Sequence, residues 1–495
     1  MTTQTQPTRK ILRVLFMGAE ADPLIKVGGL ADVTGSLPRA LRKLSPDKTG
    51  GYTLDVRLAV PFHHGIHSRQ KNPRLATEFS LRRGRGRIHG RAYETEVNGV
   101  PVYLIEGPPF IEEMPVYLYD TPLDGDRYTF FSLGALKAVE NLKWKPDVVH
   151  ANDWHTAISL YALRVKKHIM EYFTDTRTIL TIHNLPFMGA GSGPALQTYG
   201  LPASRADILP KWARHFPLPL GMLTADHITA VSPTYAQEIM TPEFGCGLQD
   251  FLLTRADRVS GILNGLDMDL WDPTKDLLIP QPFGKDSLAQ RHVNKIELLK
   301  EFNLDLTADV PLLALIGRMD YQKGVDLALE SFRQLKDLPL QAIILGTGDP
   351  VLQADALKLE SGLPDRFRAA IRFDANLARR MYAGADILVM PSRYEPCGLA
   401  QMIAMRYGCV PLARATGGLK DTITDIAAGD AATGILFEDA AVPALTTAMA
   451  RAIMAYANRS LWLKIQQNGM QQDFSWERSA IAYSDLYRQP KKEDR

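Results

Sequence analysis

The 495-residue chain has only three cysteines and no apolar run of the length that a membrane helix needs. Cys246, Cys397 and Cys409 offer neither a disulfide framework nor the spacing of metal ligands, a usage typical of a reducing compartment. A membrane helix needs about 18 consecutive apolar residues. The apolar run 11–19 is short and is interrupted by Arg13, so it fits a buried strand better than a signal peptide. We therefore expect a cytoplasmic protein without membrane contact.

The chain also lacks an excess of charge of either sign. It carries 57 Lys and Arg against 55 Asp and Glu, a formal net charge of +2. This balance argues against a surface-wide attraction to nucleic acid, and no nucleic-acid partner is expected. The dense basic run is Arg82-Arg83-Gly84-Arg85-Gly86-Arg87, extended by Arg91. It fits either a solvated hairpin or an edge that contacts a polyanion or a glucan.

Motifs of several enzyme classes are missing. The sequence contains no G-x-x-x-x-G-K-[ST] phosphate loop and no G-x-S-x-G nucleophile elbow. The first glycine turn, between Gly18 and Gly29, lacks G-x-G-x-x-G, which disfavours a nicotinamide-dependent enzyme. His150, Asp153 and His155 are an alternative set of metal ligands, but no further cluster has ligand spacing. We expect no metal centre.

Short apolar runs alternate with helical patterns, which indicates parallel strands covered by helices on both faces. The pattern restarts after Asn264-Gly265-Leu266-Asp267, and a hinge is expected at residues 271–273 and 280–282. The sequence thus predicts an α/β fold with two doubly wound, Rossmann-like domains, residues 1–265 and 266–475. Residues 476–495 are expected to form an amphipathic helix and a tail that pack back on the first domain. Examples of the expected strands are 11–17, 102–105, 148–150, 178–182, 227–231, 312–316, 341–345 and 387–390.

Two glycine pairs occupy similar places in the two halves of the chain. They are Lys26-Val27-Gly28-Gly29-Leu30 and Thr416-Gly417-Gly418-Leu419, and each follows a strand-like run and precedes a helix-like one. Paired glycines at such a turn let backbone N–H groups approach an anion, and a helix N-terminus adds partial positive charge. Two such turns indicate one ligand gripped by two similar domains.

Charged candidates follow two expected strands of the second half. Pro391-Ser392-Arg393-Tyr394-Glu395-Pro396-Cys397-Gly398-Leu399 places the carboxylate of Glu395 at a carboxyl strand end, where doubly wound sheets bind ligands. Arg318 and Lys323 flank the loop after the strand 312–316. The planar guanidinium of Arg318 and the compact ammonium of Lys323 together suit a diphosphate. The alternative for Glu395 is a surface glutamate without a ligand, and the alternative for Arg318 and Lys323 is an ordinary exposed pair of cations.

Polar candidates follow two expected strands of the first half. They lie in His150-Ala151-Asn152-Asp153-Trp154-His155 and in Thr181-Ile182-His183-Asn184. Both clusters are candidates for hydrogen bonds to sugar hydroxyls. His183 equally fits a buried histidine whose hydrogen bonds are satisfied within the fold.

With these motifs in order along nearly the whole chain, the sequence resembles the bacterial glycogen synthases and plant starch synthases. These are retaining glycosyltransferases of family 5 with the two-domain GT-B fold. The resemblance extends from Lys26-Val27-Gly28-Gly29-Leu30-Ala31-Asp32 to Phe474-Ser475-Trp476. It implies transfer of glucose from ADP-glucose to the non-reducing end of an α-1,4-glucan (glycogen or a maltooligosaccharide), with retained configuration and no cofactor. The alternatives are a GT-B transferase that uses UDP-glucose and a non-catalytic glucan-binding relative.

The resemblance also implies roles for single residues. Arg318 and Lys323 hold the diphosphate, Glu395 binds the donor glucose, and His183 lies beside its anomeric carbon. Retaining glycosidases use two carboxylates about 5 Å apart, but only Glu395 is a credible candidate, so a same-face mechanism is expected. The candidate catalytic residues are Glu395, Lys323, Arg318, His183 and Lys26. The candidate substrate-binding residues are Lys26, Gly28, Gly29, Asp32, Asn152, Asp153, His155, Asn264, Phe373 (stacked on adenine), Cys397, Gly398, Leu399, Thr416, Gly417 and Gly418.

Four positions depart from the family pattern. Ala400 stands where many relatives have Thr, and Ile403 stands where related retaining transferases have a second Glu. Gln249-Asp250 stands where relatives usually read Asp-Gly. We expect these changes to affect donor affinity and loop geometry and to leave the reaction class unchanged. The sequence gives no indication of the oligomeric state.

Overall fold

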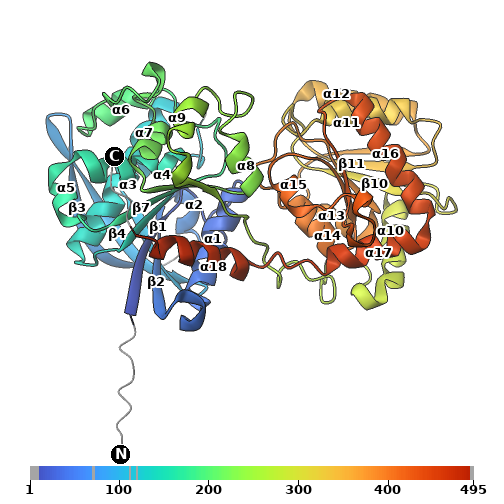
Figure 1. The fold of residues 1–495 in the computed structure, drawn as a ribbon, viewed down its shortest axis with the longest axis horizontal. Coiled ribbons are helices and arrows are strands. Elements are labelled where there is room, and N and C mark those ends of the chain that lie inside the picture. The colour runs from blue at the N-terminus through green and yellow to red at the C-terminus, as the bar shows by residue number, and fades with distance from the viewer. Residues whose placement is uncertain (1–9, 70–72, 111–112, 119–120, 491–495) are drawn as a thin grey trace, which may run out of the picture. The chain divides into compact units, whose positions relative to one another are not determined.

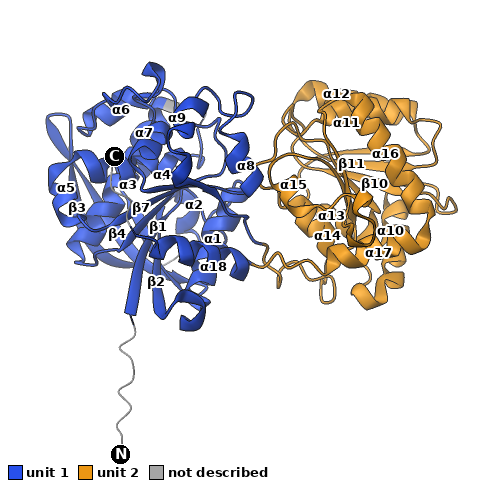
Figure 2. Ribbon diagram, viewed as in Figure 1, with its two compact units in different colours: residues 1–265, 476–495 blue, residues 266–475 orange. Residues whose placement is uncertain are grey.

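The computed structural model describes residues 10–69, 73–110, 113–118 and 121–490. The chain divides into two compact units, shown in different colours in Figure 2. Unit 1 comprises residues 1–265 and 476–495, and unit 2 comprises residues 266–475. The chain therefore passes between the units twice, once after Gly265 and once after Ser475.

The sheet of unit 1 has the strand order β3-β4-β5-β2-β1-β6-β7-β8-β9. Its strands run parallel except β4, which is antiparallel to β3 and β5. The order reverses between β1 and β6, and ligands of doubly wound sheets bind at such a switch point. The bounds are β1 Lys10–Met17, β2 Tyr52–Pro61, β3 Arg74–Arg83, β4 Gly86–Val97, β5 Val100–Glu106, β6 Val148–Asn152, β7 Arg177–Ile182, β8 His227–Ala230 and β9 Val259–Gly261.

The basic run forms the turn of the hairpin β3–β4. Gly84 lies in the turn with a positive φ of 58°. Arg83 Nη2 lies 2.9 Å from Asp126 Oδ1, and Arg91 forms ion pairs with Glu78 and Glu106. The hairpin interpretation is confirmed, and its antiparallel direction is a difference from the expected all-parallel sheet.

Helices flank the sheet of unit 1, and the last helix of the chain belongs to this unit (Figure 1). Apolar side chains of α1 and α18 share one core cluster with β1, β2 and β5. The Tyr487 hydroxyl of α18 lies 2.6 Å from His150 Nδ1 on β6. The helices are α1 Gly29–Lys43, α2 His64–His67, α3 Thr121–Asn141, α4 Asp153–Val165, α5 Lys167–Tyr172, α6 Gly193–Thr198, α7 Pro217–Thr224, α8 Pro233–Glu238, α9 Gln249–Leu253 and α18 Trp476–Arg488.

Unit 2 contains a parallel sheet with the strand order β12-β11-β10-β13-β14-β15. Its switch point lies between β10 and β13. The strands are β10 Leu312–Ile316, β11 Gln341–Gly346, β12 Phe367–Ile371, β13 Ile387–Met390, β14 Val410–Arg414 and β15 Ile435–Phe437. The helices are α10 Arg291–Glu301, α11 Val325–Gln334, α12 Pro350–Gly362, α13 Ala375–Gly384, α14 Ala400–Arg406, α15 Gly417–Thr422, α16 Val442–Ala457 and α17 Arg459–Met470. Short 3₁₀ segments are Pro46–Thr49, Pro108–Phe110, Lys211–Ala213, Ala256–Arg258, Lys285–Gln290 and Ile426–Ala431.

The segment expected to be a hinge, residues 271–273 and 280–282, belongs to unit 2. The Arg379 guanidinium lies 4.2 Å from the centre of the Trp271 ring. Asp276 Oδ2 accepts hydrogen bonds from Tyr407 Oη at 2.5 Å and from Arg379 Nη1 at 3.1 Å. These contacts hold Trp271 and Asp276 against unit 2, and the hinge at residues 271–273 and 280–282 stays a prediction.

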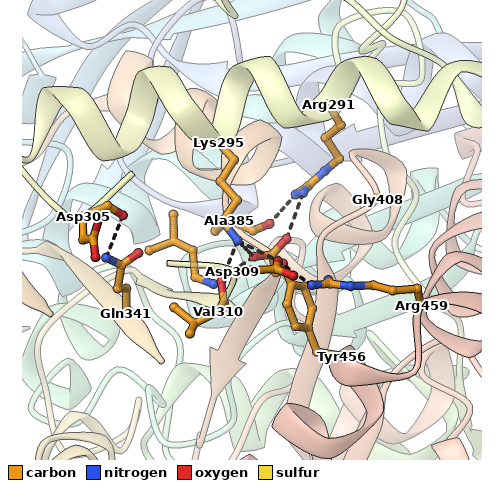
Figure 3. Close-up of polar contacts among 12 residues, drawn as sticks. Arg291, Lys295, Asp305, Asp309, Val310, Gln341, Ala385, Gly408, Tyr456 and Arg459 are labelled. Atoms are coloured by element: carbon orange, nitrogen blue, oxygen red, sulfur yellow. Dashed lines mark hydrogen bonds and ion pairs between the residues drawn. The ribbon is translucent and has the colours of Figure 1, made fainter. Parts of the chain in front are cut away.

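A buried ionic cluster anchors α10 within unit 2 (Figure 3). Lys295 Nζ lies 2.7 Å from Asp386 Oδ2, and both side chains are 8% exposed. The same carboxylate accepts a hydrogen bond from the backbone N–H of Leu312, the first residue of β10. Arg291 donates to the carbonyls of Tyr382, Ala385 and Tyr407, which lie at the carboxyl ends of α13 and α14. A cation is favourable at these helix ends.

No helix among the described residues is long and apolar enough to cross a membrane.

Candidate active site

Two loops of unit 2 follow the strands at its switch point. One follows β10 and carries Arg318 and Lys323, and the other follows β13 and carries Glu395. Lys323 Nζ lies 2.6 Å from Glu395 Oε2, which also accepts a hydrogen bond from Ser392 Oγ at 2.9 Å. The side chain of Glu395 is 7% exposed and that of Lys323 is 26% exposed. The fold thus brings together a cation and a carboxylate that are 72 residues apart in the sequence.

Arg318 is the more accessible cation of this pair of loops. Its side chain is 63% exposed and its Nη1 lies 2.7 Å from Asp320 Oδ2. Its Nη2 donates to Gln322 Oε1 at 2.9 Å. These contacts orient the guanidinium but leave most of it accessible, as an anion-binding group requires. Phe373, which follows β12, is 86% exposed and is accessible for stacking.

The glycine pair of unit 2 packs tightly against the Glu395 loop. A Cβ on Gly417 would lie 2.0 Å from the Glu395 carbonyl oxygen, and one on Gly418 would lie 2.1 Å from the Cys397 carbonyl oxygen. The N–H of Gly418 donates to that Glu395 carbonyl at 3.1 Å. In this structure the pair therefore holds the Glu395 loop against the N-terminus of α15, a role that the anion-binding interpretation missed. Thr416, the residue before α15, is buried.

Gly398 and Leu399 end the Glu395 loop. Gly398 has a φ of 72°, Leu399 precedes α14, and Cys397 is buried.

Arg393 joins the two loops, and no sequence motif had selected it. Its guanidinium makes a fork to Asp326 of α11, with distances of 2.8 Å to Oδ1 and 2.7 Å to Oδ2. It donates to the Tyr321 carbonyl at 2.7 Å and lies 3.5 Å from the centre of the Tyr321 ring. Its backbone N–H donates to the Gln322 carbonyl at 2.8 Å. Arg393 therefore fixes the loop of Lys323 relative to the loop of Glu395 without contacting either side chain in these hydrogen bonds.

The glycine turn of unit 1 follows β1 at the switch point of that sheet. Lys26 Nζ lies 2.5 Å from Asp32 Oδ1, and the Lys26 side chain is 46% exposed. The backbone N–H groups of Val27 and Gly28 donate to the carboxylate of Glu20 at 2.5 and 3.1 Å. The amides expected to face a ligand are thus used by an internal anion. Gly29 is the first residue of α1.

Glu20 is a residue that the motif analysis missed, although it lies in the same loop. It is 1% exposed and also accepts a hydrogen bond from Tyr117 Oη at 2.8 Å. Burial raises the pKa of Glu20, and the hydrogen bonds from Val27, Gly28 and Tyr117 oppose that rise. A buried carboxylate needs such donors, which explains why it organises the turn.

Asn152, Asp153 and His183 meet at the carboxyl ends of β6 and β7. Asn152 Oδ1 lies 2.9 Å from His183 Nε2, and Asp153 Oδ1 accepts a hydrogen bond from the His183 backbone N–H at 2.7 Å. Burial raises the pKa of Asp153 to about 7 and lowers the pKa of His183 to about 3. His183 is therefore a neutral imidazole at pH 7.

The other candidates of unit 1 have different surroundings. His155 lies between aromatic rings, with centroids 4.9 Å from Tyr117 and 4.6 Å from Tyr128, and burial lowers its pKa well below the usual value. His150 binds Tyr487 and Thr181 within the fold, so it is a satisfied buried histidine. Asn264 is buried, and its Oδ1 has no hydrogen-bond partner among the described residues, as expected of a group that binds a ligand.

The described residues contain no group of three or more His, Cys, Asp or Glu side chains that could hold a metal ion.

Comparison with known proteins decides the family. The starch synthase catalytic domain family matches residues 13–254, and the glycosyl transferases group 1 family matches residues 299–468. The glycogen synthase 2 of Geobacter sulfurreducens is 37% identical over 492 residues, which cover 96% of this chain and 98% of that protein. The chain belongs to the glycogen synthase and starch synthase family. The glycogen synthase of Nitrosomonas europaea, another member, is 37% identical over 502 residues and 98% of both chains.

Solved structures agree with this family. The catalytic domain of starch synthase IV from Arabidopsis thaliana, bound to ADP and acarbose, matches with a TM-score of 0.84. It is 31% identical, and the match covers 96% of this chain and 98% of that chain. Sucrose-phosphate synthase from Thermosynechococcus elongatus shares the fold, with a TM-score of 0.60 at 19% identity. The expected family and GT-B fold are confirmed, and this glycogen synthase family member is a glycosyltransferase.

Proposed function

We propose that this glycogen synthase family member transfers glucose from ADP-glucose to the non-reducing end of an α-1,4-glucan and retains the anomeric configuration. The observation that carries the proposal is the Lys323–Glu395 pair at the switch point of unit 2, with Arg318 on the same loop as Lys323. A family member of 31% identity was solved with ADP and acarbose bound, which supports a nucleotide and a saccharide as ligands.

Lys323 and Arg318 are proposed to bind the diphosphate of the donor. Their positive charges offset the negative charge that develops on ADP as the glycosidic bond breaks, and such electrostatic stabilisation is usually the largest catalytic contribution. Arg318 offers an accessible planar fork and Lys323 a point charge held by Glu395. We propose that this pair takes the place of a divalent metal and that the enzyme needs no cofactor.

Glu395 is proposed to bind hydroxyl groups of the donor glucose. Its contacts with Lys323 and Ser392 use Oε2, and we assign the other carboxylate oxygen, Oε1, to the sugar. From unit 1, we assign His183 and Asn264 to the donor sugar as well. The unpartnered buried Oδ1 of Asn264 supports its part of this assignment.

Retention is proposed to occur on one face of the sugar. Glu395 is the one carboxylate that we assign to the donor glucose, whereas double displacement in glycosidases uses two carboxylates about 5 Å apart. In the same-face route, the acceptor 4-hydroxyl forms the new C1–O bond as the bond from C1 to the phosphate oxygen breaks. The departing phosphate takes the hydroxyl proton. Isolation of a glucosyl adduct on a side chain would contradict this route.

The proposed location is the cytoplasm. Its support is that none of the three cysteines, Cys246, Cys397 and Cys409, forms a disulfide, as is usual in a reducing compartment.

The decisive experiment measures glucose incorporation into glycogen from ADP-glucose and UDP-glucose side by side. We expect incorporation from ADP-glucose, released again by an enzyme specific for α-1,4 bonds. Incorporation from UDP-glucose alone would identify the alternative transferase, and no incorporation from either donor would favour a non-catalytic glucan-binding protein. A glucan-binding assay without donor separates that last case from an unfolded sample.

A further inference from the structure

Asn152 has both ends of its side-chain amide engaged inside unit 1. It is the last residue of β6 and is completely buried. Its Nδ2 donates to the carbonyl of Met17, the last residue of β1, at 2.9 Å. Its Oδ1 lies 2.9 Å from His183 Nε2. The side chain therefore spans the switch point of this sheet and ends on the histidine assigned to the donor sugar.

The Met17 carbonyl fixes which way the amide of Asn152 points. A carbonyl oxygen only accepts hydrogen bonds, so the amide group that faces Met17 must be the NH₂. The group that faces His183 is then Oδ1, which also only accepts. His183 Nε2 must therefore carry a hydrogen and donate it.

One ring nitrogen of His183 is left as an acceptor. A neutral imidazole carries a hydrogen on one nitrogen, and the hydrogen bond made by the other side of the ring decides which one. Burial keeps His183 neutral at pH 7. With the hydrogen on Nε2, Nδ1 has a lone pair and accepts a hydrogen bond. In the opposite tautomer, the lone pair of His183 Nε2 would face the lone pairs of Asn152 Oδ1, with no hydrogen between them.

We propose that Asn152 is a positioning residue that fixes His183 as the Nε2–H tautomer, so that Nδ1 accepts a hydrogen bond from a hydroxyl of the bound sugar. Asn152 then acts through His183 and does not itself bind the substrate. The tautomer follows from the contacts of the free chain, whereas the sugar contact rests on the proposed glucosyl transfer.

The tautomer is tested by NMR on the full chain labelled with ¹⁵N at histidine, without ligand. We expect long-range ¹H–¹⁵N spectra at pH 7 to show a protonated Nε2 and an unprotonated Nδ1 for His183, with its signals assigned by their loss in His183→Gln. A protonated Nδ1, or rapid averaging between the two nitrogens, would overturn the proposal without any variant at Asn152.

Asn152→Ala and a matched control test the functional part. The control is Asn294 in unit 2, which is also buried. Its Oδ1 accepts a hydrogen bond from the backbone N–H of Gln281, and its Nδ2 donates one to the Gln281 carbonyl. We expect Asn152→Ala to give tautomer averaging at His183 and a fall in kcat/KM of about 3- to 10-fold, the range for one lost hydrogen bond. Asn294→Ala should change neither measurement.

Failure of this inference is distinguishable from failure of the proposed function. If the wild-type chain transfers no glucose, the proposed function fails while the NMR result on the tautomer stands. If Asn152→Ala gives tautomer averaging at His183 but keeps the wild-type kcat/KM, the inference fails while glucosyl transfer stands.

Discussion

Replacing His63 by Gln should make unit 1 less sensitive to acid. His63 is 1% exposed, and its Nε2 lies 2.9 Å from the Ala19 carbonyl oxygen. Burial lowers the pKa of His63 to about 4, from 6.5 in an unfolded chain. A glutamine side chain keeps an N–H donor for Ala19 but has no proton to gain at acid pH. The substitution therefore removes one titrating group and keeps the hydrogen bond.

The sign and size of the effect follow from linkage. A histidine with a depressed folded pKa contributes stability above the unfolded value of 6.5, and this is lost as the pH falls, because only the unfolded chain takes up the proton. Between pH 7 and pH 5 the loss is about 2 kcal/mol per histidine, at 1.36 kcal/mol per pKa unit. His150 and His183, both with pKa lowered to about 3, lose the same amount.

Buried carboxylates act in the opposite direction. The pKa of Asp153 is raised to about 7, so the folded chain binds its proton first and gains about 2 kcal/mol between pH 7 and pH 5. Three histidines against one aspartate leave a net loss of about 4 kcal/mol for unit 1. The lowered pKa of His155 adds to this loss, and the raised pKa values of Glu20 and Asp32 reduce it.

Calorimetry at pH 7, 6 and 5 measures the effect. Unit 2 contains a single histidine, the exposed His292, and serves as an internal reference for the transition of unit 1. We expect the wild-type transition of unit 1 to fall by on the order of 10 °C, at about 2–4 °C per kcal/mol. His63→Gln should recover about 2 kcal/mol of the loss. His89→Gln, on the exposed face of β4, should recover nothing. Equal pH dependence of His63→Gln and wild type would refute the reasoning.

The remaining predictions concern unit 2. Glu395→Gln should lower kcat/KM for ADP-glucose about 10- to 150-fold, the range for a hydrogen bond to a charged group, and an unchanged value in a folded variant would place the site elsewhere. Arg393→Lys loses the fork to Asp326 of α11, so kcat should fall about tenfold, roughly one hydrogen bond of charge-assisted strength. The control Arg333→Lys disrupts a half-exposed ion pair between α11 and Asp355 of α12, and it should keep the wild-type kcat. Lys295→Met removes the nearer of the two cations that pair with the buried Asp386 carboxylate and leaves Arg291 Nη1 at 3.7 Å. It should destabilise unit 2 by about 1.5–3 kcal/mol in denaturant unfolding, the range for a hydrogen bond to a charged group, with KM for ADP-glucose unchanged in the folded fraction. A loss below about 1 kcal/mol would mean that water or Arg291 replaces the lost contact.

The sequence anticipated the strands best where apolar runs are continuous. Residues 312–316 and 387–390 were predicted and found as β10 and β13, because strands covered on both faces need side chains that are apolar throughout. The strand β4 was anticipated only as part of a possible solvated hairpin and not as a strand of the main sheet. Its partly exposed, arginine-rich sequence alternates between the two faces of a sheet edge, so it has no continuous apolar run.

Site residues that follow predicted strands were found from the sequence, whereas residues that act through distant partners were not. Lys323 and Glu395 were selected because each follows a predicted strand, and the structure places them 2.6 Å apart. Arg393 and Glu20 were missed because their importance comes from partners that no local pattern reveals. Arg393 contacts Asp326, 67 residues away, and Glu20 contacts Tyr117, 97 residues away.

The sequence by itself determined the family, the reaction class and the loops that carry charge, because these depend on residue types next to recognisable strands. Only the tertiary structure decided how the loops are held and what their groups face. The glycine amides of unit 1 bind Glu20, and Asn152 binds His183 and Met17. The physical reason is that burial and hydrogen-bond partners depend on which strands lie side by side in the folded sheet.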